Sequence, residues 1–289
     1  MDDLRQRLKT HVEALAKEPR VPGTPAHERA MMYIARQLDA FDFTCILPLQ
    51  GRVRGTPWNV LTLPEPRKER PVFVLGAHYD TVEGSPGADD NASGVAALLE
   101  VARLIGPRLK DSNVALQIAA YDLEEKGLLG SLEHCRRLKT TGRTVLAMMS
   151  LEMLGYKDST PGSQKVPGGI LAPATGDFLA VIANQESKDL LKCVPDHPGK
   201  ILKATLPKGS QSEQLAHLSD HGAFWQHGHR ALLVTDTAFL RNPHYHQPSD
   251  TPGSLDYDFL TESTRVVLKT VGKILGLDPQ EDVNEVAAE

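Results

Sequence analysis

The sequence predicts an α/β fold of three layers (α/β/α), in which helices cover both faces of a central mixed sheet that is mostly parallel. Two observations support this prediction. Short, unbroken apolar runs alternate along the chain with segments of helical periodicity, which is the pattern of parallel strands joined by crossover helices. A content of 40% hydrophobic and 24% charged residues in a chain of 289 is ordinary for a globular protein. We find neither an internal repeat nor a linker, so one domain over residues 1–289 is expected.

The first sixty residues predict two helices followed by a pair of strands. In residues 3–16, the apolar side chains that share one helical face are Leu4, Leu8, Val12 and Leu15. A second helix is expected from Pro25 to Leu38, because Thr24 is a good N-cap residue and proline is favoured in the first turn. Residues 43–63 predict a β-hairpin, with Gly51 and Gly55 as breakers.

Four apolar runs predict the strands at the centre of the sheet. They are residues 71–77, 114–121, 144–153 and 231–237. Helical periodicity predicts helices at residues 92–106, 131–138 and 257–275. The stretch 156–215 mixes glycine, proline and lysine, and we expect one helix in it near 176–192. The acidic tail at 279–289 is expected to be disordered.

Charge and cysteine content exclude several classes of partner. The formal net charge is −5 and no basic stripe is present, which argues against nucleic acid. No apolar run approaches the length of a membrane span. The three cysteines form no CxxC pair, and the first residues are polar, so we expect reduced thiols, no signal peptide and a cytoplasmic protein. The sequence gives no indication of the oligomeric state.

Residues suited to metal binding stand where the predicted strands end. His78 follows the first central run, Glu124 and Glu125 follow the second, and Glu152 ends the third. The carboxyl ends of parallel strands meet at one edge of a sheet, which is where ligands bind in such folds. Zinc accepts histidine nitrogen and carboxylate oxygen. These positions, together with the motifs GADDNASG (87–94) and NPHYHQPSD (242–250), predict a site for two zinc ions bridged by a carboxylate.

Each of these residues can be given a role by its chemistry. Asp90 is short and held in a polar turn, so it suits a bridge between cations about 3.5–4 Å apart. Two adjacent buried acids repel each other unless a cation or proton separates them, and we assign Glu125 to the metal and Glu124 to general base. Glu152 lies in an apolar strand and needs a charged partner. Asp80 faces the same way as His78 and can orient its imidazole.

Other readings of the same residues exist. Asp89, Asp90 or Asn91 could cap the following helix, Glu124 and Glu125 could be a solvated loop pair, and Glu152 could pair with an arginine. His244 and His246 are both candidate ligands, and their local sequence does not choose between them. Tyr245 could donate a hydrogen bond to a tetrahedral oxyanion.

Taken in this order, the motifs resemble those of the co-catalytic di-zinc aminopeptidases, a family that includes secreted bacterial leucyl-type enzymes and has glutaminyl cyclases as relatives. The resemblance runs from about Pro22 (PGTPAHERA) to Leu255. It implies a zinc-exopeptidase-like fold and two Zn²⁺ ions per chain. One ion would be held by His78, Asp90 and Glu152, and the other by Asp90, Glu125 and His246.

The resemblance also implies roles for neighbouring residues. Glu124 would be the catalytic base and Asp80 the partner of His78. His246 begins the family's HxxxDT run, which selects it over His244, and Tyr245 looks like a tyrosine that some members use on the transition state. Ser219, in SDHGAF, looks like a serine that supports the last histidine. A cis peptide is expected between Asp90 and Asn91, and this chain carries Glu152 where many members carry aspartate.

The expected function is therefore hydrolysis of N-terminal residues from peptides that carry a free N-terminus. Two alternatives use the same fold: a glutaminyl-cyclase-type acyl transferase or carboxypeptidase, and a catalytically inactive binding module. Inactive relatives lose ligands, whereas all five ligand positions and the base position are filled here. Residues 156–215 are expected to form the wall of the pocket for the substrate's side chain. The pattern of this stretch is the least informative in the chain, so the sequence does not predict which side chain is preferred.

Overall fold

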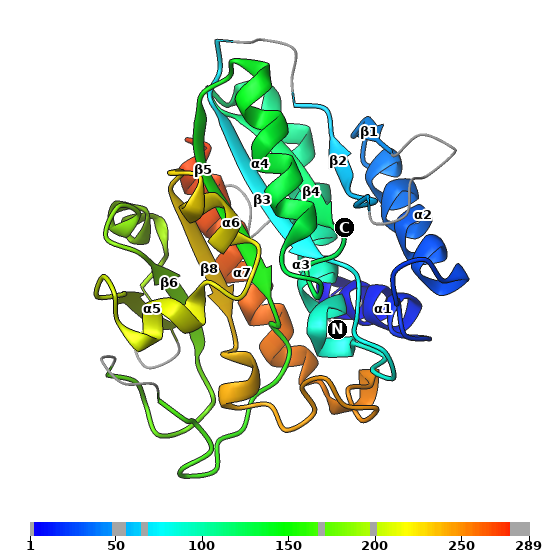
Figure 1. The fold of residues 1–289 in the computed structure, drawn as a ribbon, viewed down its shortest axis with the longest axis vertical. Helices are drawn as coiled ribbons and strands as arrows, with labels where there is room; N and C mark the ends of the chain where they lie inside the picture. The colour runs from blue at the N-terminus through cyan, green and yellow to red at the C-terminus, as the bar shows by residue number, and fades with distance from the viewer. Residues whose placement is uncertain (1–2, 48–55, 65–68, 167–170, 197–200, 278–289) are drawn as a thin grey trace.

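A mixed sheet of eight strands forms the centre of the protein in a computed structural model that describes residues 3–47, 56–64, 69–166, 171–196 and 201–277 (Figure 1). The strands are β1 (Cys45–Ile46), β2 (Val60–Thr62), β3 (Val72–His78), β4 (Ala115–Tyr121), β5 (Val145–Glu152), β6 (Leu179–Ala183), β7 (Ile201–Thr205) and β8 (Ala231–Thr235). Their order across the sheet is β1-β2-β4-β3-β5-β8-β6-β7.

The four central strands run parallel to one another. β3 pairs with β4 on one side and β5 on the other, and β5 pairs with β8. Every residue of β3, β4 and β8 is buried, which explains why these strands read as unbroken apolar runs rather than as alternating ones. Because the strands are parallel, their last residues, including His78 and Glu152, reach the same edge of the sheet.

Antiparallel strands extend the sheet on both sides. β2 pairs antiparallel with β4, and β1 pairs antiparallel with β2, as the hairpin prediction for 43–63 required. The predicted breakers Gly51 and Gly55 lie outside the described residues. On the other side, β6 runs antiparallel to β8 and β7 runs parallel to β6.

Helices cover both faces of the sheet, so the predicted three-layer arrangement is confirmed (Figure 1). One face carries α1 (Asp3–Leu15), α2 (Pro25–Ala40), α3 (Gly94–Ile105) and α7 (Tyr257–Ile274). The other face carries α4 (Leu129–Thr141), α5 (Gln211–Ala216) and α6 (His221–Gln226). In the described part of the chain, no helix has the length and apolarity that a membrane crossing requires.

The helix predicted near 176–192 is wrong. Residues 179–183 form strand β6, and a short 3-10 helix follows at Lys188–Cys193. The run Leu-Ala-Val-Ile-Ala is apolar at every position, so its periodicity cannot separate a strand from a buried helix. The segment is a strand because it pairs with β8, and all five of its residues are buried. β7, α5 and α6 were not predicted.

A buried ion cluster joins α1 to α3. Glu100 on α3 has a fully buried side chain that accepts hydrogen bonds from Arg7 and His11 on α1 and from Arg103 on its own helix. Because the acid is buried and the cluster links two helices, we expect it to stabilise the fold. It does not belong to the sheet edge that carries His78.

Replacing Glu100 by alanine is expected to lower the free energy of unfolding by about 3 kcal/mol, because it leaves the buried His11 and the partly buried arginines without their shared acceptor. Urea denaturation of the two proteins measures this difference. Glu262→Ala is the matched control: its pair with Arg265 lies on the surface and contributes about 1 kcal/mol or less. Equal midpoints for the Glu100 variant and the parent protein would refute the structural role.

Candidate metal centre

The ends of β3 and β4 are tied together by Asp80. Its two carboxylate oxygens accept hydrogen bonds from the backbone N–H groups of Glu124 and Glu125, each at 3.2 Å. Nδ1 of His78 lies 3.2 Å from the backbone oxygen of Asp80 and 3.5 Å from its Oδ1. Asp80 therefore lies beside the His78 ring and holds the backbone that carries the two glutamates.

Asp90 lies in a tight turn between β3 and α3. The turn, Ala88–Ser93, follows Gly87, which has φ of 64°, a conformation that favours glycine. The carboxylate of Asp250 accepts hydrogen bonds from the backbone N–H groups of Asp89 and Asp90. The peptide bond between Asp90 and Asn91 is cis, as the resemblance implied. These contacts hold Asp90 by its backbone, and its carboxylate is free to face the site.

Two groups of metal-type side chains meet at this edge. The first group is His78, Glu124 and Glu152, and the second is Asp90, Glu125 and His246. Asp90 also contacts the first group: its Oδ1 lies 3.3 Å from Nε2 of His78, whereas its Oδ2 lies 3.2 Å from Nε2 of His246. The two oxygens of one carboxylate thus serve two neighbouring groups, which is the arrangement of a bridging ligand.

The donor spacing fits zinc. Donor atoms around a tetrahedral zinc ion lie about 3.3 Å apart, given metal–ligand distances near 2.0–2.2 Å. Nε2 of His78 is 3.4 Å from Oε1 of Glu152, and Nε2 of His246 is 3.1 Å from Oε2 of Glu125. Oε1 of Glu125 is one of the buried atoms of the described chain that have no hydrogen-bond partner. The structure thus brings all five predicted ligands together in a zinc-compatible geometry.

The electrostatics of the site favour a bound cation. Burial lowers the pKa of His246, but hydrogen bonds and attraction from Asp90 and Glu125 outweigh it and raise that pKa to about 10. Burial likewise opposes protonation of His78, yet Glu124 and Glu152 raise its pKa well above the ordinary value. The negative potential that favours protonated imidazoles also favours a divalent ion in their place.

Glu124 differs from its neighbour Glu125 in its surroundings. Burial raises the pKa of Glu124 well above its ordinary value, and repulsion from Glu152 and Asp220 adds to this against the attraction of His78. Its Oε2 lies 4.0 Å from Nε2 of His78, farther than the oxygens of Asp90 and Glu152. A buried carboxylate beside the cation site and with a raised pKa suits a general base.

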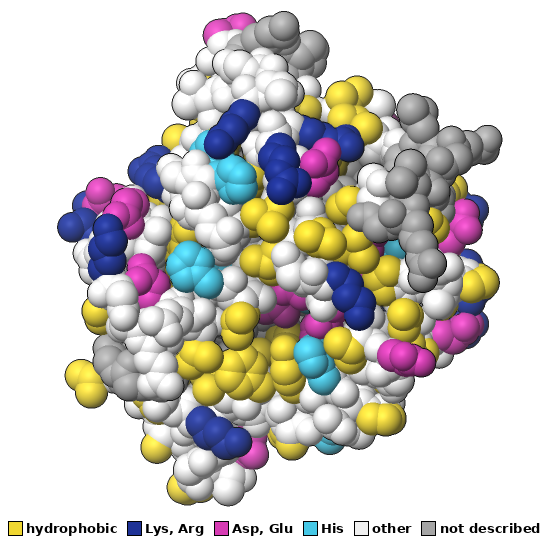
Figure 2. Space-filling view, in the orientation of Figure 1, with side chains coloured by type: hydrophobic (Ala, Val, Ile, Leu, Met, Phe, Trp, Pro, Cys, Tyr) yellow, Lys and Arg dark blue, Asp and Glu magenta, His cyan; other side chains and the backbone are white. Residues whose placement is uncertain are grey.

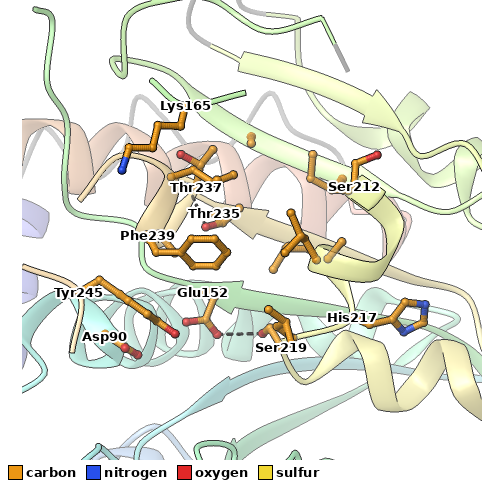
Figure 3. Close-up of a pocket in the computed structure, with 18 of the residues that line it drawn as sticks. Asp90, Glu152, Lys165, Ser212, His217, Ser219, Thr235, Thr237, Phe239 and Tyr245 are labelled. Carbon is orange, nitrogen blue, oxygen red and sulfur yellow. Dashed lines mark hydrogen bonds between the residues drawn. The ribbon is translucent and has the colours of Figure 1, made fainter. Parts of the chain in front are cut away.

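Ser219 has a different partner from the one that the resemblance implied. Its hydroxyl donates to Oε2 of Glu152 at 2.8 Å, and no contact with His246 is recorded for it in the described structure (Figure 3). The reason is that α6 packs against β5, the strand that ends at Glu152, and Ser219 lies just before α6. Ser150 on β5 also contacts Ser219. Ser219 thus orients the other oxygen of Glu152.

The loop before α7 separates the two candidate histidines. His246 turns toward Asp90 and Glu125, whereas Nδ1 of His244 lies 2.9 Å from Oγ of Ser249. The ring of Tyr245 stacks on that of His246 at 3.8 Å, and Figure 3 shows its hydroxyl pointing toward Glu152. The structure therefore brings His246 and Tyr245 to the site and leaves His244 outside it.

Several supporting residues were not predicted. Asp89 is fully buried and accepts hydrogen bonds from Asn242 and from the backbone of Gly155. Asp250, the aspartate of the HxxxDT run, holds the Asp90 turn. Arg20 is buried beneath the loops that follow β3. One feature of the sequence could have pointed to such residues: a charged side chain among apolar neighbours needs a partner when it is buried.

An apolar pocket opens beside the metal-type residues. Its volume is about 480 Å³, and Asp90, Glu124, Glu125, Glu152 and His246 stand at one end of it. Apolar side chains from β6, β7, β8 and α5 line much of the remaining wall, among them Ile182, Leu202, Leu215, Ala216 and Leu233, and Phe178 lines it from just before β6. Figure 2 shows acidic side chains near the centre of this face with hydrophobic ones around them. The pocket lies where residues 156–215 were expected to form a wall.

Two relatives are similar to most of this chain. The chain is 34% identical to the uncharacterized protein YfbL of Escherichia coli over 73% of this chain and 69% of that protein. It is 30% identical to a probable leucine aminopeptidase of Arthroderma benhamiae over 70% of this chain, and it spans about half of that relative, 54% of its length.

Solved structures share the fold. A zinc aminopeptidase from Bacillus subtilis matches with a TM-score of 0.68 at 16% identity, covering 96% of each chain. The glutaminyl cyclase of Porphyromonas gingivalis matches with a TM-score of 0.66 at 20% identity, covering 94% of this chain and 99% of its own. The sequence pattern of peptidase family M28 matches residues 59–271, so the match covers most of the chain. The chain belongs to peptidase family M28.

Proposed function

We propose that this member of the M28 peptidases is an aminopeptidase that uses two zinc ions. The observation that carries the proposal is the position of Asp90, whose two oxygens face His78 and His246 separately. His78, Asp90 and Glu152 would hold one ion, and Asp90, Glu125 and His246 the other. When bound, such a pair lowers the pKa of a shared water toward about 7 and polarises a carbonyl group.

The chain's own residues supply proton transfer and orientation. Glu124 accepts the proton of the attacking water and passes it to the leaving amine. Asp80 fixes the backbone of Glu124 and the ring of His78. Tyr245, whose hydroxyl points into the same space, donates to the oxyanion of the tetrahedral intermediate. Burial and the surrounding carboxylates raise the pKa of Tyr245, so its hydroxyl keeps the proton that it donates.

Replacing Tyr245 by phenylalanine is expected to lower kcat about 100-fold, with KM little changed, because an oxyanion donor acts in the transition state. Steady-state kinetics on leucine p-nitroanilide measure both constants. Phe239→Leu is a control, since its ring packs against Tyr245 without offering a donor. An unchanged kcat for the Tyr245 variant would remove Tyr245 from the chemistry.

The substrate is proposed to be a peptide with a free N-terminus and an apolar first side chain. Four carboxylates at the end of the pocket attract a charged α-amine, which a blocked peptide lacks. The apolar walls contributed by β6, β7 and α5 suit a large hydrophobic side chain such as that of leucine or phenylalanine.

Narrowing the pocket tests the side-chain preference. Ala216 lines the pocket from α5 and is only partly buried, so a larger residue there intrudes on the cavity more than on the core. Ala216→Phe is expected to lower kcat/KM for leucyl and phenylalanyl substrates about 10–100-fold, a loss typical of blocked hydrophobic contacts. The alanyl substrate is the internal control and keeps its rate. Equal losses for all three substrates would place the side chain elsewhere.

A panel of substrates tests the activity as a whole. Release of the first residue from a free peptide, with no release from its N-acetylated form, is expected. Cyclisation of N-terminal glutamine with a single zinc ion would favour the cyclase reaction, and release of the last residue would favour a carboxypeptidase. A folded protein that binds no metal and cleaves none of the panel would be an inactive binding module.

A further inference from the structure

Arg20 is a fully buried arginine that lies behind the metal-type residues, in the segment between α1 and α2. Its side chain donates only to backbone carbonyl groups among the described residues. Nε donates to Tyr79 at 2.7 Å, Nη1 to Leu15 at 3.0 Å and Pro86 at 2.7 Å, and Nη2 to Gly87 at 2.8 Å. Its backbone N–H also donates to Oγ1 of Thr81 at 2.8 Å.

Leu15 ends α1, and the other three acceptors lie in the segment that connects His78 to the turn of Asp90. Tyr79 stands between His78 and Asp80 at the end of β3, and Gly87 stands immediately before the turn that contains Asp90. A single guanidinium group therefore connects the backbone beside His78 to the backbone that leads to Asp90. Space is tight at this junction: a Cβ atom on Gly87 would lie 2.9 Å from Nη2 of Arg20 and would also contact the backbone oxygen of Asp90.

The geometry needs an arginine rather than a positive charge in general. The guanidinium group is planar and offers five N–H donors in a fixed arrangement, whereas a lysine ammonium is a compact charge with three donors on a flexible stem. Burial lowers the pKa of Arg20 to about 10, while Asp250 and Asp90 oppose that shift, so the group is charged at neutral pH.

Charge and hydrogen bonding predict opposite effects on metal affinity. A buried cation near the site repels divalent ions, so loss of its charge alone would strengthen metal binding. Loss of its hydrogen bonds would free the loops after β3 to move apart, and metal binding would weaken. The number of carbonyl groups that Arg20 joins favours the second effect.

We propose that Arg20 is a positioning residue that holds the two ends of the segment between His78 and Asp90 at a fixed separation and so sets the spacing of donor atoms at the proposed Asp90-bridged centre. The inference rests on the proposed two-metal function. The segment after α1 would then contribute to the active site, although it is far from the ligands in the sequence.

Co²⁺ titration of the full chain tests this role, because the visible absorption of Co²⁺ reports coordination geometry. The variants are Arg20→Met and Arg20→Lys. Both are expected to bind Co²⁺ about 10–100-fold more weakly than the parent protein, the usual effect of losing a group that orients metal ligands. A changed absorption spectrum at saturation is also expected. Arg7→Met is the matched control, since it removes a partly buried arginine of α1 whose ion pair is with Glu100 on α3.

Several outcomes would overturn the proposal. Parental Co²⁺ affinity and spectrum in both Arg20 variants would make Arg20 a stability element only, even if both melt at lower temperature. Tighter binding by Arg20→Met would assign the effect to charge. Parental binding by Arg20→Lys would show that the fixed donor arrangement of the guanidinium group does not set the spacing of the ligands. If Arg20→Met does not fold, Thr81→Val removes one contact of the same junction and is expected to weaken Co²⁺ binding in the same direction; parental affinity there would contradict the proposal.

The Co²⁺ stoichiometry of the parent protein tests the two-metal site separately from the role of Arg20. If the parent protein binds one Co²⁺ ion instead of two, the proposed two-metal function is wrong. The comparison of each variant with the parent still decides whether Arg20 orients the ligands that are present.

Discussion

Replacing Glu124 by glutamine is expected to lower kcat by about 10²–10⁴-fold, because the amide cannot accept the proton of the attacking water. The zinc content is expected to stay at the parental value. Glu124 and Glu125 are adjacent, yet their environments differ: Glu125 lies 3.1 Å from His246, whereas Glu124 is the more distant carboxylate from His78 at 4.0 Å. The variant therefore separates proton transfer from metal binding.

Steady-state kinetics and elemental analysis of the same preparation make this measurement. Glu186→Gln, the same substitution at an exposed position after β6, is the control and should leave both quantities unchanged. Near-normal turnover would remove Glu124 as the base. Loss of one zinc ion would instead make Glu124 a ligand, a reading that its grouping with His78 and Glu152 permits.

Replacing Asp90 by alanine is expected to abolish activity and to reduce the zinc content at both positions. Asp90 contacts His78 through one oxygen and His246 through the other, so its loss removes one ligand from each ion. Removal of a shared ligand also leaves the two ions without the negative charge between them. Asp111→Ala, at an exposed aspartate after α3, is the control for loss of one acidic side chain.

Elemental analysis after dialysis against a weak chelator gives the zinc content of each protein. The expected value for the Asp90 variant is below one ion per chain. If this variant kept one full ion and lost only the other, Asp90 would serve a single site and would not be a bridge.

The sequence predicted the central strands because their environment is uniform. β3, β4, β5 and β8 are buried in the middle of the sheet, so each reads as an apolar run bounded by polar residues. β6 has a similar run, but a run of five apolar residues fits a strand and a buried helix equally well, and its pairing with β8 makes it a strand. The predictions of one domain over 1–289 and of a cytoplasmic location stay predictions, and the tail at 279–289 lies outside the described residues.

The proximity of the five candidate ligands could be predicted because they stand at strand ends or in compact motifs, whereas the residues that support them could not. Asp250 and the turn at Asp90 are separated by 160 residues, and Arg20 and Gly87 by 67, so no local pattern links them. The partner of Ser219 was misassigned for the same reason. Its contact with Glu152 depends on how α6 packs on β5, which only the tertiary structure contains.

A crystal structure of the zinc-loaded protein, with anomalous differences measured at the zinc absorption edge, tests the bridging role of Asp90 most directly. Two anomalous peaks about 3.5–4 Å apart are expected, with one oxygen of Asp90 coordinated to each. A single peak, or two peaks with Asp90 bound to only one of them, would contradict the two-metal account.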